Sequence, residues 1–433
     1  MKTLYAKQRT SVDFLKGALL RHNGALDSSG TGVGKTVIAC RAALELGMPV
    51  AIVCPKIVIP QWKRELAELG IEPVFVTNYE KLKRGGPHLA KVGKKLFRWL
   101  LPENTLIIWD EVHKCRTPFS QNSQMLIAAK QAGYFNLMLS ATACQDPTEM
   151  RSIGFALGLH SLNRAEGQLK SWFTWMLEHG CRKDHWNAWH AGSVAKLKEI
   201  NTKMYGVNAT RLTCEDLASE FAGNQIITEP LAFSSLKDIV KFYDQHGITP
   251  DIVEQFLENG GASPHILVEM LRARQLAEAA KVPDIIEMVW EARAEGFSVA
   301  VFVNFVDTVK ALQESFGSKC AVVVGGQKDT EREDNVQMFQ RNDARVIVCN
   351  IAAGGTGVSL HDTEGGHPRM SLISPTFDEK AYVQTLGRIH RAGAKSSCVQ
   401  RVLVASGTIE EKILVKLEHK RLFRETLHTN PLP

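Results

Sequence analysis

The sequence predicts an α/β protein with two parallel-sheet lobes and a mostly helical insertion between them. Short apolar runs rich in β-branched residues alternate with longer stretches of helical spacing in both halves of the chain. The length, 433 residues, is too great for one average domain of roughly 150 residues. The alternation stops over residues 158–230 and resumes after them. Helix-covered parallel sheets on both sides of a helical segment account for these three observations.

The first lobe is expected over residues 1–157. A short apolar run, Ala25–Leu26, precedes a glycine-rich loop, and four further apolar runs end at polar or turn residues, as buried strands do. These strand candidates are Val50–Cys54, Val74–Thr77, Leu106–Trp109 and Leu137–Ser140.

The insertion, residues 158–230, mixes aromatic and charged residues. Its tryptophans are expected in the core of a helical subdomain, although tryptophan also stacks on unpaired bases. They are Trp172, Trp175, Trp186 and Trp189. Its histidines and cysteine match no common zinc spacing, which favours packing over metal binding. They are His179, Cys181, His185 and His190.

The second lobe is expected over residues 231–425, followed by a tail of residues 426–433. A helical stretch, Lys237–Arg293, contains a turn signal at Asn259–Gly261. Four apolar runs then predict the strands of a second sheet. They are Val299–Val303, Ala321–Val324, Val346–Cys349 and Val402–Val404.

Composition excludes several classes of protein. The net charge is only +6, which permits a polyanionic partner without requiring one. The nine cysteines are scattered singly, so neither a disulfide framework nor a zinc finger is expected. The N-terminal residues lack the apolar core of a secretion signal, and no apolar run is long enough to cross a bilayer. We therefore expect a protein of the cytoplasm, or of the nucleus in a eukaryote, without membrane contact.

The stretch Ser28–Thr36 has the composition of a phosphate-binding loop. It lies between an apolar run and a helical run, so its backbone N–H groups and the positive end of the helix dipole would face phosphate oxygens. Lys35 would reach the β and γ phosphates, and Thr36 would bind Mg²⁺. Ser29 stands where the general pattern has glycine. The contacting residues are Gly30, Thr31, Gly32, Val33, Gly34, Lys35 and Thr36.

A nucleoside triphosphatase also needs a carboxylate for the metal and a group that orients the attacking water. Asp110 and Glu111 directly follow the predicted strand Leu106–Trp109. Because ligands bind at the carboxyl edge of a parallel sheet, both side chains should emerge beside the phosphate loop. Asp110 would hold the metal and Glu111 would polarise the nucleophile.

The order of the motifs along the chain resembles that of the superfamily 2 helicases and translocases. The phosphate loop and Asp110–His113 are followed by Ser140–Thr142, by Gly354–Gly357 and by Gln384–Arg391. The resemblance covers nearly the whole chain and is greatest to the compact, annealing-helicase-like members of the Swi/Snf-related branch. It implies two RecA-like lobes and an ATPase that uses ATP and Mg²⁺.

The resemblance also implies roles for individual residues. Gln8 would read adenine, and Gly357 would contact the nucleotide. Arg388 and Arg391, three apart on a presumed helix, would act as arginine fingers on the γ phosphate. His113, Ser140, Thr142 and Gln384 would couple the nucleotide state to lobe geometry. The nucleic-acid backbone would contact Lys56, Asn78, Asn304 and Thr356.

The function predicted from these residues is ATP-driven movement along DNA, duplex or branched, in replication, recombination or repair. We expect a monomer that works with replication or recombination proteins, and the absence of obvious appended domains would suit a viral or phage protein. Two alternatives stay open at this point: a helicase that separates strands of DNA or RNA, and a nucleotide-gated binding subunit.

Overall fold

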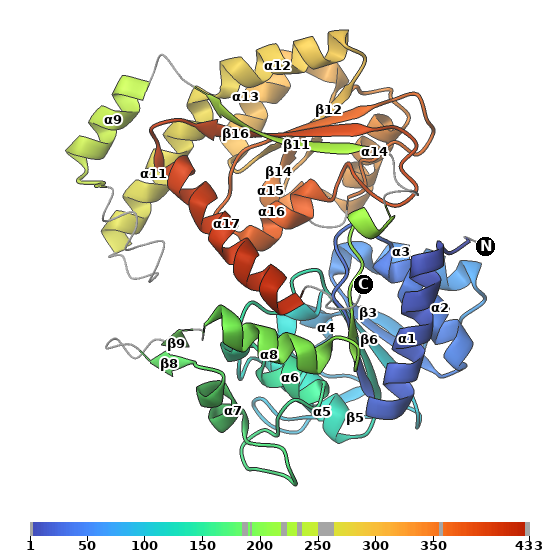
Figure 1. The fold of residues 1–433 in the computed structure, drawn as a ribbon. Helices are drawn as coiled ribbons and strands as arrows, with labels where there is room; N and C mark the ends of the chain where they lie inside the picture. The colour runs from blue at the N-terminus through green and yellow to red at the C-terminus, as the bar shows by residue number, and fades with distance from the viewer. Residues whose placement is uncertain are drawn as a thin grey trace. The chain divides into compact units, whose positions relative to one another are not determined.

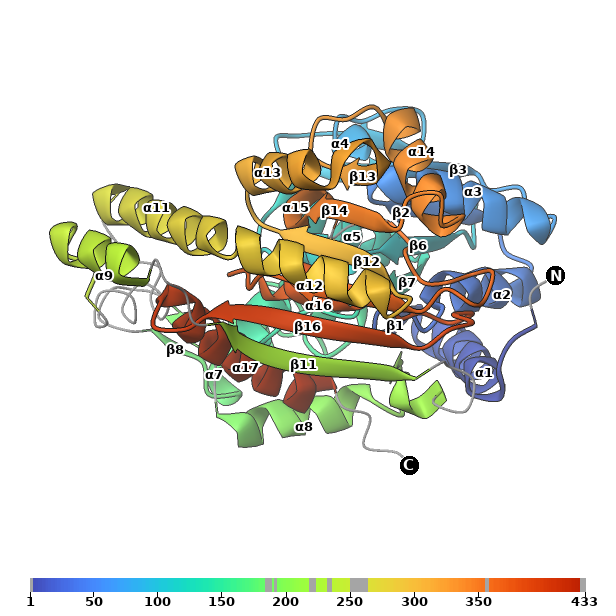
Figure 2. The ribbon, with the colours of Figure 1, turned by 90° about the horizontal axis from the view of Figure 1, so that it is seen from above.

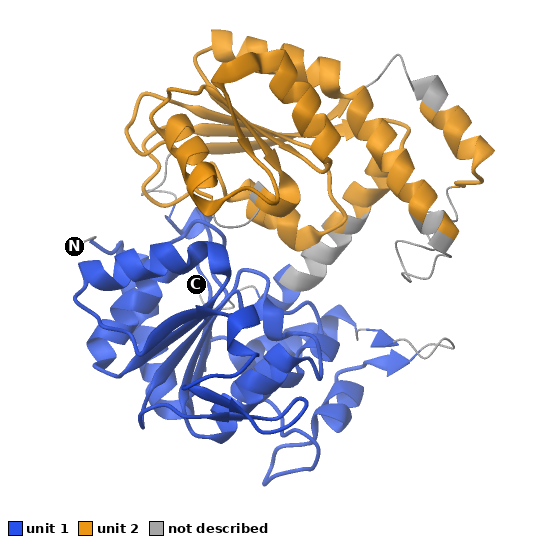
Figure 3. Cartoon of the chain, turned by 180° about the vertical axis from the view of Figure 1, so that it is seen from behind, with its two compact units in different colours: residues 1–217, 422–433 blue, residues 218–421 orange. Residues whose placement is uncertain are grey.

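The computed structural model describes residues 3–183, 189–190, 193–217, 223–231, 236–249, 264–354 and 358–428 (Figure 1). The chain forms two compact units (Figure 3). Unit 1 comprises residues 1–217 and 422–433, and unit 2 comprises residues 218–421. Each unit contains one six-stranded sheet in which all strands run parallel, so the predicted fold class is confirmed.

The sheet of unit 1 has the strand order β10-β1-β7-β6-β2-β3. All four strands predicted in this half are present, and β1 covers the apolar run before the loop. The strands are β1 (Gly24–Asp27), β2 (Val50–Cys54), β3 (Phe75–Asn78), β6 (Leu106–Asp110), β7 (Phe135–Leu139) and β10 (Ala209–Thr210). Asp27 and Asp110 both pair with Leu139, so these strands end at the same edge of the sheet.

Helices cover the sheet of unit 1. Alternate strand residues such as Val53, Ile107 and Trp109 pack in one core with Met125 and Leu126 of α5. The helices are α1 (Ala6–His22), α2 (Lys35–Leu46), α3 (Ile59–Glu68), α4 (Tyr79–Leu82), α5 (Gln121–Gln131), α6 (Arg151–Ala156), α7 (Trp172–Glu178) and α8 (Val194–Met204). Two small antiparallel hairpins complete the unit: β4 (Leu89–Lys91) with β5 (Phe97–Trp99), and β8 (Arg182–Lys183) with β9 (Trp189–His190).

The sheet of unit 2 has the strand order β11-β16-β15-β12-β14-β13. The four predicted strands are confirmed, and two strands were not predicted: β11, which lies in the expected insertion, and β15. The strands are β11 (Asn224–Leu231), β12 (Ser298–Val303), β13 (Cys320–Val323), β14 (Val346–Asn350), β15 (Arg369–Ile373) and β16 (Cys398–Ala405).

The two faces of this second sheet carry separate cores. Val299 and Val301 pack with α12 and α13, whereas Ala300 and Phe302 pack with α14 on the other face. Figure 2 shows α12 and α13 lying across the strands. The helices are α9 (Leu236–Gln245), α11 (Pro264–Ala280), α12 (Val282–Ala294), α13 (Val306–Phe316), α14 (Asp329–Gln340), α15 (Ile351–Gly354), α16 (Glu379–Leu386) and α17 (Ile409–His428). Among the described residues, no helix has the length and apolar character that crossing a bilayer requires.

The compact units do not follow the predicted boundaries at 157/158 and 230/231. Residues 158–217 belong to unit 1, where α8 contributes Leu197 and Ile200 to the core. The rest of the expected insertion belongs to unit 2, because β11 pairs with β16 along its whole length. The expected tail is also different: α17 continues to His428, and both Leu427 and His428 are fully buried in unit 1.

Candidate functional site

The glycine-rich loop joins β1 to α2 as the sequence predicts. Gly32 and Gly34 have φ values of 83° and 93°, in the left-handed region that glycine tolerates, and Gly34 caps the N-terminus of α2. A Cβ atom at Gly34 would lie 2.7 Å from Nε2 of Gln8. Both the backbone angle and the lack of space therefore require glycine here, and the loop directs the N-terminus of α2 toward the carboxyl edge of the sheet.

Lys35 lies within this loop. Its Nζ donates hydrogen bonds of 2.8 Å to the carbonyl oxygens of Ser29 and Gly30. The loop is also held from its other side, because the N–H of Ser28 donates to Thr210 and that of Gly30 to Leu212. The strand β10 that provides this support was not predicted, since a two-residue strand gives no periodic signal.

Gln8 is buried against the phosphate loop. Its Nε2 donates to the carbonyl of Val33 at 2.8 Å, and its Oε1 accepts from the N–H of Tyr5 at 3.0 Å. An amide has two N–H donors and an oxygen with two lone pairs. These two bonds use one of the two N–H donors and one of the two oxygen lone pairs of Gln8 and fix its side chain to the loop.

Asp110 ends β6 and is held on both sides by aromatic residues. Its Oδ2 accepts from Nε1 of Trp62 at 2.8 Å, and its carbonyl accepts from the hydroxyl of Tyr79 at 2.8 Å. Burial raises the pKa of Asp110 to about 7, and the neighbouring charge of Glu111 acts in the same direction. The sequence did not predict these two aromatic contacts. Trp62 lies near the start of α3, which places its indole within hydrogen-bond distance of Asp110.

Glu111, His113 and Ser140 form one connected group. Oε2 of Glu111 lies 3.0 Å from Nδ1 of His113 and 3.5 Å from Oγ of Ser140, and Oγ lies 3.1 Å from Nδ1. Oγ of Ser140 also accepts from the N–H of Thr142 at 3.2 Å. Glu111 itself has a φ of 55°, a left-handed conformation that is rare outside glycine and is found at functional sites. The two sequence motifs that contain these residues therefore meet at the ends of β6 and β7.

The donor set at this edge fits a magnesium nucleotide. It contains a hydroxyl in the first turn of α2, Thr36, two adjacent carboxylates and the Lys35 ammonium. A divalent cation beside Asp110 would lower the raised pKa of this carboxyl, because the positive charge of the metal favours the ionised form. A third carboxyl, Asp27, is fully buried at the loop entrance and accepts from the N–H of Ser29 at 2.9 Å. Burial raises the pKa of Asp27 as well.

The two arginines of unit 2 do not share a helix face as the sequence predicts. The helix α16 ends at Leu386, and both arginines follow it in turn and irregular backbone. They nevertheless gather on one segment. Nη1 of Arg388 donates to the carbonyl of Val358 at 3.0 Å, and Nη1 of Arg391 donates to Oγ of Ser359 at 2.6 Å. The two arginines are therefore close because both bind the segment Val358–Ser359, and not because of helical spacing.

Comparison with known proteins places this arrangement in a family. A family model described as the helicase conserved C-terminal domain matches residues 280–393. A protein of Acanthamoeba polyphaga mimivirus named as an ATP-dependent RNA helicase is 31% identical over 97% of this chain and 82% of its own length. The chain belongs to the superfamily 2 helicases and translocases. It is therefore a nucleic-acid-dependent ATPase of the Swi/Snf-related branch.

Two further relatives of this superfamily 2 ATPase are more distant. The DNA repair protein rhp54 of Schizosaccharomyces pombe is 30% identical over 28% of this chain and 14% of that protein. Among solved structures, the SWI2/SNF2 ATPase core of Sulfolobus solfataricus in complex with dsDNA covers 98% of this chain and 92% of that chain, with 19% identity and a TM-score of 0.40.

The residues expected to contact nucleic acid in this superfamily 2 ATPase occupy different settings. Lys56 and Asn78 follow or end the neighbouring strands β2 and β3, in which Cys54 pairs with Asn78, so both lie at the carboxyl edge of the sheet. Asn304 follows β12, and its Nδ2 donates to the buried Glu278 and to the carbonyl of Pro375. Its amide nitrogen therefore serves the fold. Thr356 and Gly357 lie outside the described residues.

The described tryptophans of the expected insertion and His179 pack as predicted, whereas His190 is exposed. Trp175 is buried in the core of unit 1, and Trp172 and Trp189 pack against that core. Nδ1 of His179 contacts the carbonyl of Trp175 at 2.8 Å. Within the described ranges, no three or more His, Cys, Asp and Glu side chains gather as a group that could hold a metal ion by themselves. Trp186 and His185 lie outside these ranges.

Gln384 and His390 are buried near the two arginines of unit 2. A buried ion pair supports the same unit from the other side: Nζ of Lys281 lies 2.7 Å from Oε1 of Glu410 and also donates to the carbonyl of Leu403. Glu410 lies in the first turn of α17 and also accepts from the N–H of Ala405 at 2.9 Å.

Proposed function

We propose that this chain is an ATP-dependent translocase that moves along duplex DNA without fully separating its strands. The observation that carries the proposal is the connected group Glu111, His113 and Ser140 beside the phosphate loop. It joins a candidate catalytic carboxylate to the Ser140–Thr142 segment through hydrogen bonds. A hydrolytic event at Glu111 would thus reach a second motif within unit 1.

The ATP site works through charge and position. Lys35 exchanges its two bonds to loop carbonyls for phosphate oxygens when the triphosphate enters the loop. Gln8 takes the adenine edge, and Glu111 orients the attacking water. Thr36 and Asp110 would hold Mg²⁺, which would neutralise charge on the phosphates.

Unit 2 supplies the positive charge that the reaction needs in its transition state. Arg388 and Arg391 act as arginine fingers toward the γ phosphate, a contribution worth about 10³ to 10⁵ in rate in related nucleotide hydrolases. In this proposal residues 1–157 act as the ATP-binding lobe and the second sheet acts as the helicase C-terminal lobe. Hydrolysis then depends on alternation between two arrangements of these lobes.

In this proposal the protein holds the nucleic acid through contacts to its phosphate backbone. Lys56 and Asn78, at one sheet edge, bind phosphates and carry little sequence information. The printed name of one relative, a DNA repair protein, refers to DNA, which supports DNA as the polymer. The relative from the mimivirus is named as an RNA helicase, so an RNA-dependent helicase is the second candidate.

The deciding experiment compares ATP turnover with duplex DNA, single-stranded DNA, branched DNA and RNA. We expect the largest stimulation with duplex or branched DNA, together with displacement of a third strand from a triplex and no release of duplex strands. Stimulation by RNA alone, with release of a paired strand, would favour the helicase.

Two variants and a matched control test the ATP site in the same assay. Lys35→Ala should lose nucleotide binding, and Glu111→Gln should bind nucleotide but turn over about 10² to 10⁴-fold more slowly. Lys63→Ala, an exposed lysine of α3, should behave as the wild type. A rate that is independent of nucleic acid in the unaltered protein would instead indicate a nucleotide-gated binding subunit.

A further inference from the structure

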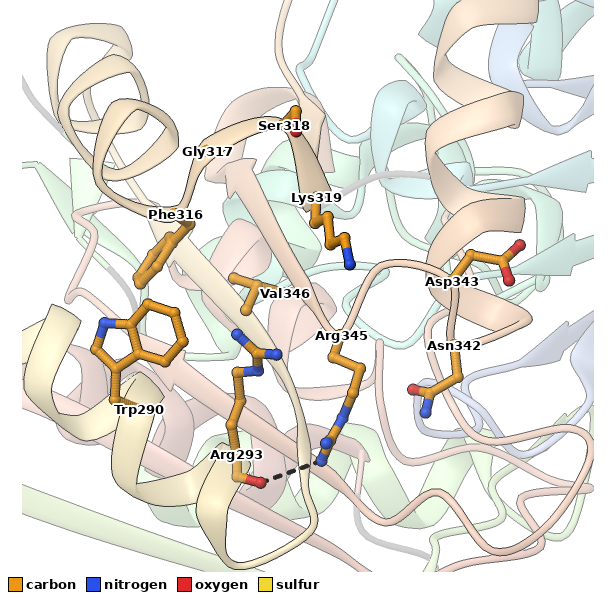
Figure 4. Close-up of a pocket in the computed structure, with 10 residues that line it drawn as sticks. All are labelled: Trp290, Arg293, Phe316, Gly317, Ser318, Lys319, Asn342, Asp343, Arg345 and Val346. Atoms are coloured by element: carbon orange, nitrogen blue, oxygen red, sulfur yellow. Dashed lines mark hydrogen bonds between the residues drawn. The ribbon is translucent and has the colours of Figure 1, made fainter.

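A pocket of about 450 Å³ lies in unit 2, beside the segments that precede β13 and β14 (Figure 4). Its walls come from the end of α12 and from the segments that lead into β13 and β14. These segments lie at the amino-terminal ends of the strands, whereas Asn304 and Ser359 follow the carboxyl ends of β12 and β14. The volume is within the range of small-ligand pockets, roughly 300–1,000 Å³. The pocket is therefore separate from the proposed ATPase machinery.

One wall of the pocket is aromatic. Trp290 is 47% exposed although it lies in a helix whose other face is buried in the core. Its ring meets that of Phe316 edge to face, with centroids 6.0 Å apart. The half-exposed indole and the neighbouring ring thus offer an aromatic surface to a ligand in the pocket.

Cationic side chains form the rest of the pocket wall. Arg293, Lys319 and Arg345 line the pocket, and no ion pair joins any of them to a carboxylate among the described residues. Asp343, the one carboxylate of the lining, points away from Arg293 and Lys319 in Figure 4. Three positive charges thus surround a space that holds no negative partner from the lining.

Arg293 and Arg345 are held by neighbouring groups, but each has an N–H group without a hydrogen-bond acceptor. Nη2 of Arg345 donates to the carbonyls of Arg293 and Phe297, at 3.2 and 2.9 Å. The Nε atoms of Arg293 and Arg345 are both buried and have no hydrogen-bond partner in the structure. The guanidinium of Arg293 lies 4.9 Å from the ring centre of Trp290. The guanidinium groups of Arg293 and Arg345 are charged donors of the kind that binds a phosphate or carboxylate strongly.

We propose that this pocket binds one nucleotide unit, with its base against Trp290 and Phe316 and its phosphate against Arg293, Lys319 and Arg345. An aromatic face next to guanidinium groups is the arrangement that binds nucleotides without base specificity. An acidic peptide would use the cations but would leave the exposed indole face unused. The ligand is a free nucleotide or a nucleotide of a nucleic-acid strand; the second source rests on the proposed function.

Photocross-linking tests the proposal on the full chain. The ATP site is first saturated with a non-hydrolysable ATP analogue and Mg²⁺. The protein is then irradiated with 5-iodo-dUMP, or with oligonucleotides that carry a single 5-iodouracil at the 5′ end, in the interior or at the 3′ end. Peptide mapping should locate a cross-link at Trp290. A cross-link with the mononucleotide identifies a free ligand, and one with a single oligonucleotide identifies the strand position.

Variants make the test specific. The double variant Arg293→Gln and Lys319→Gln leaves Arg345 and its two carbonyl contacts in place, so the fold should be kept. Its affinity for the labelled oligonucleotide or mononucleotide should fall about tenfold or more, as expected for loss of phosphate contacts beside a stacked base. Trp290→Leu should abolish the cross-link. Arg341→Gln, an exposed arginine of the same unit outside the pocket, is the matched control.

The outcomes separate this inference from the proposed function. Absence of any cross-link at Trp290, or cross-linking that survives in the double variant, overturns the inference and leaves DNA-stimulated ATP turnover untouched. Binding of a polyglutamate peptide that depends on Arg293 and Lys319, without a nucleotide cross-link, overturns it in favour of an acidic protein partner. Loss of nucleic-acid stimulation in the unaltered protein overturns the proposed function, and the mononucleotide arm still tests the pocket.

Discussion

The two units share an architecture but differ in how their candidate catalytic groups are held. Unit 1 presents Lys35, Asp110 and Glu111 from a loop and a strand end of one sheet edge, each bonded to a neighbour within that unit. Unit 2 has an equally regular sheet, yet its two arginines come from irregular backbone after α16 and are held by Val358 and Ser359. The comparison teaches that a parallel sheet alone does not make a phosphate site. The sequence predicts a phosphate-binding loop only in unit 1, where residues 28–36 join β1 to α2.

The largest expected effect comes from removal of an arginine of unit 2, which tests whether that unit contributes to catalysis. Arg391→Ala should reduce the stimulated ATPase rate by about 10³ to 10⁵ while the affinity for an ATP analogue changes little, because the charge acts in the transition state. Turnover assays and titration with a fluorescent ATP analogue measure the two quantities.

The matched control for this variant is Arg341→Ala, an exposed arginine at the end of α14 in the same unit. It should leave both quantities unchanged. A loss of analogue affinity in Arg391→Ala equal to its loss of rate would place the arginine in ground-state binding, and the contrast between the units would no longer hold.

The stability of the two units can be compared through the buried pair of Lys281 and Glu410. Lys281→Met leaves a carboxylate buried without its cation, which costs about 3–5 kcal/mol. Chemical denaturation should therefore show an early transition of unit 2, with unit 1 little affected. Lys310→Met, in an exposed pair with Asp307, should change the unfolding free energy little.

The double variant Lys281→Met and Glu410→Gln sharpens the result. It removes both charges together, so it should recover part of the lost stability. Equal destabilisation by the single and double variants would mean that the pair contributes packing and not charge compensation.

The smallest expected effect is a pH dependence that belongs to unit 1 alone. The pKa of Asp110 is raised to about 7, so the carboxyl is protonated below that pH. The bound proton then competes with Mg²⁺ for the carboxylate oxygens. Affinity for the magnesium-bound ATP analogue should rise up to about tenfold per pH unit as the pH approaches 7, and then level off. Calorimetry between pH 5.5 and 8 measures it.

Asp110→Asn is the control for this prediction, because an amide does not titrate. It should bind the magnesium-bound analogue weakly and with a flat pH profile over the same range. An unchanged slope in this variant would assign the proton to another group, with the buried Asp27 as the first to examine.

Local sequence pattern was sufficient for the parts of the fold that are locally encoded. β-branched runs such as Val50–Cys54 are strands wherever they are buried, and the loop between β1 and α2 requires its glycines for backbone reasons. The proximity of Glu111 to Ser140 also follows, because β6 and β7 are neighbouring parallel strands that end together.

The missed features depend on contacts between distant segments. β15 carries the buried Arg369, whose charge is placed over the ring of Phe339 at 4.4 Å, so the strand does not appear as an apolar run. β11 is largely exposed and is defined by its pairing with β16, to which a side-chain ion pair between Glu229 and Arg401 is added. The end of α16 before Arg388 was missed because the spacing of two arginines does not reveal that Gly387 terminates a helix.

The return of the chain to its first unit has a mechanical consequence. The polypeptide passes from unit 1 to unit 2 after Leu217 and comes back within α17, so two covalent connections join the units instead of one. A protease cut at one connection would leave the halves joined by the other, with His428 still bonded to Tyr205 as an anchor.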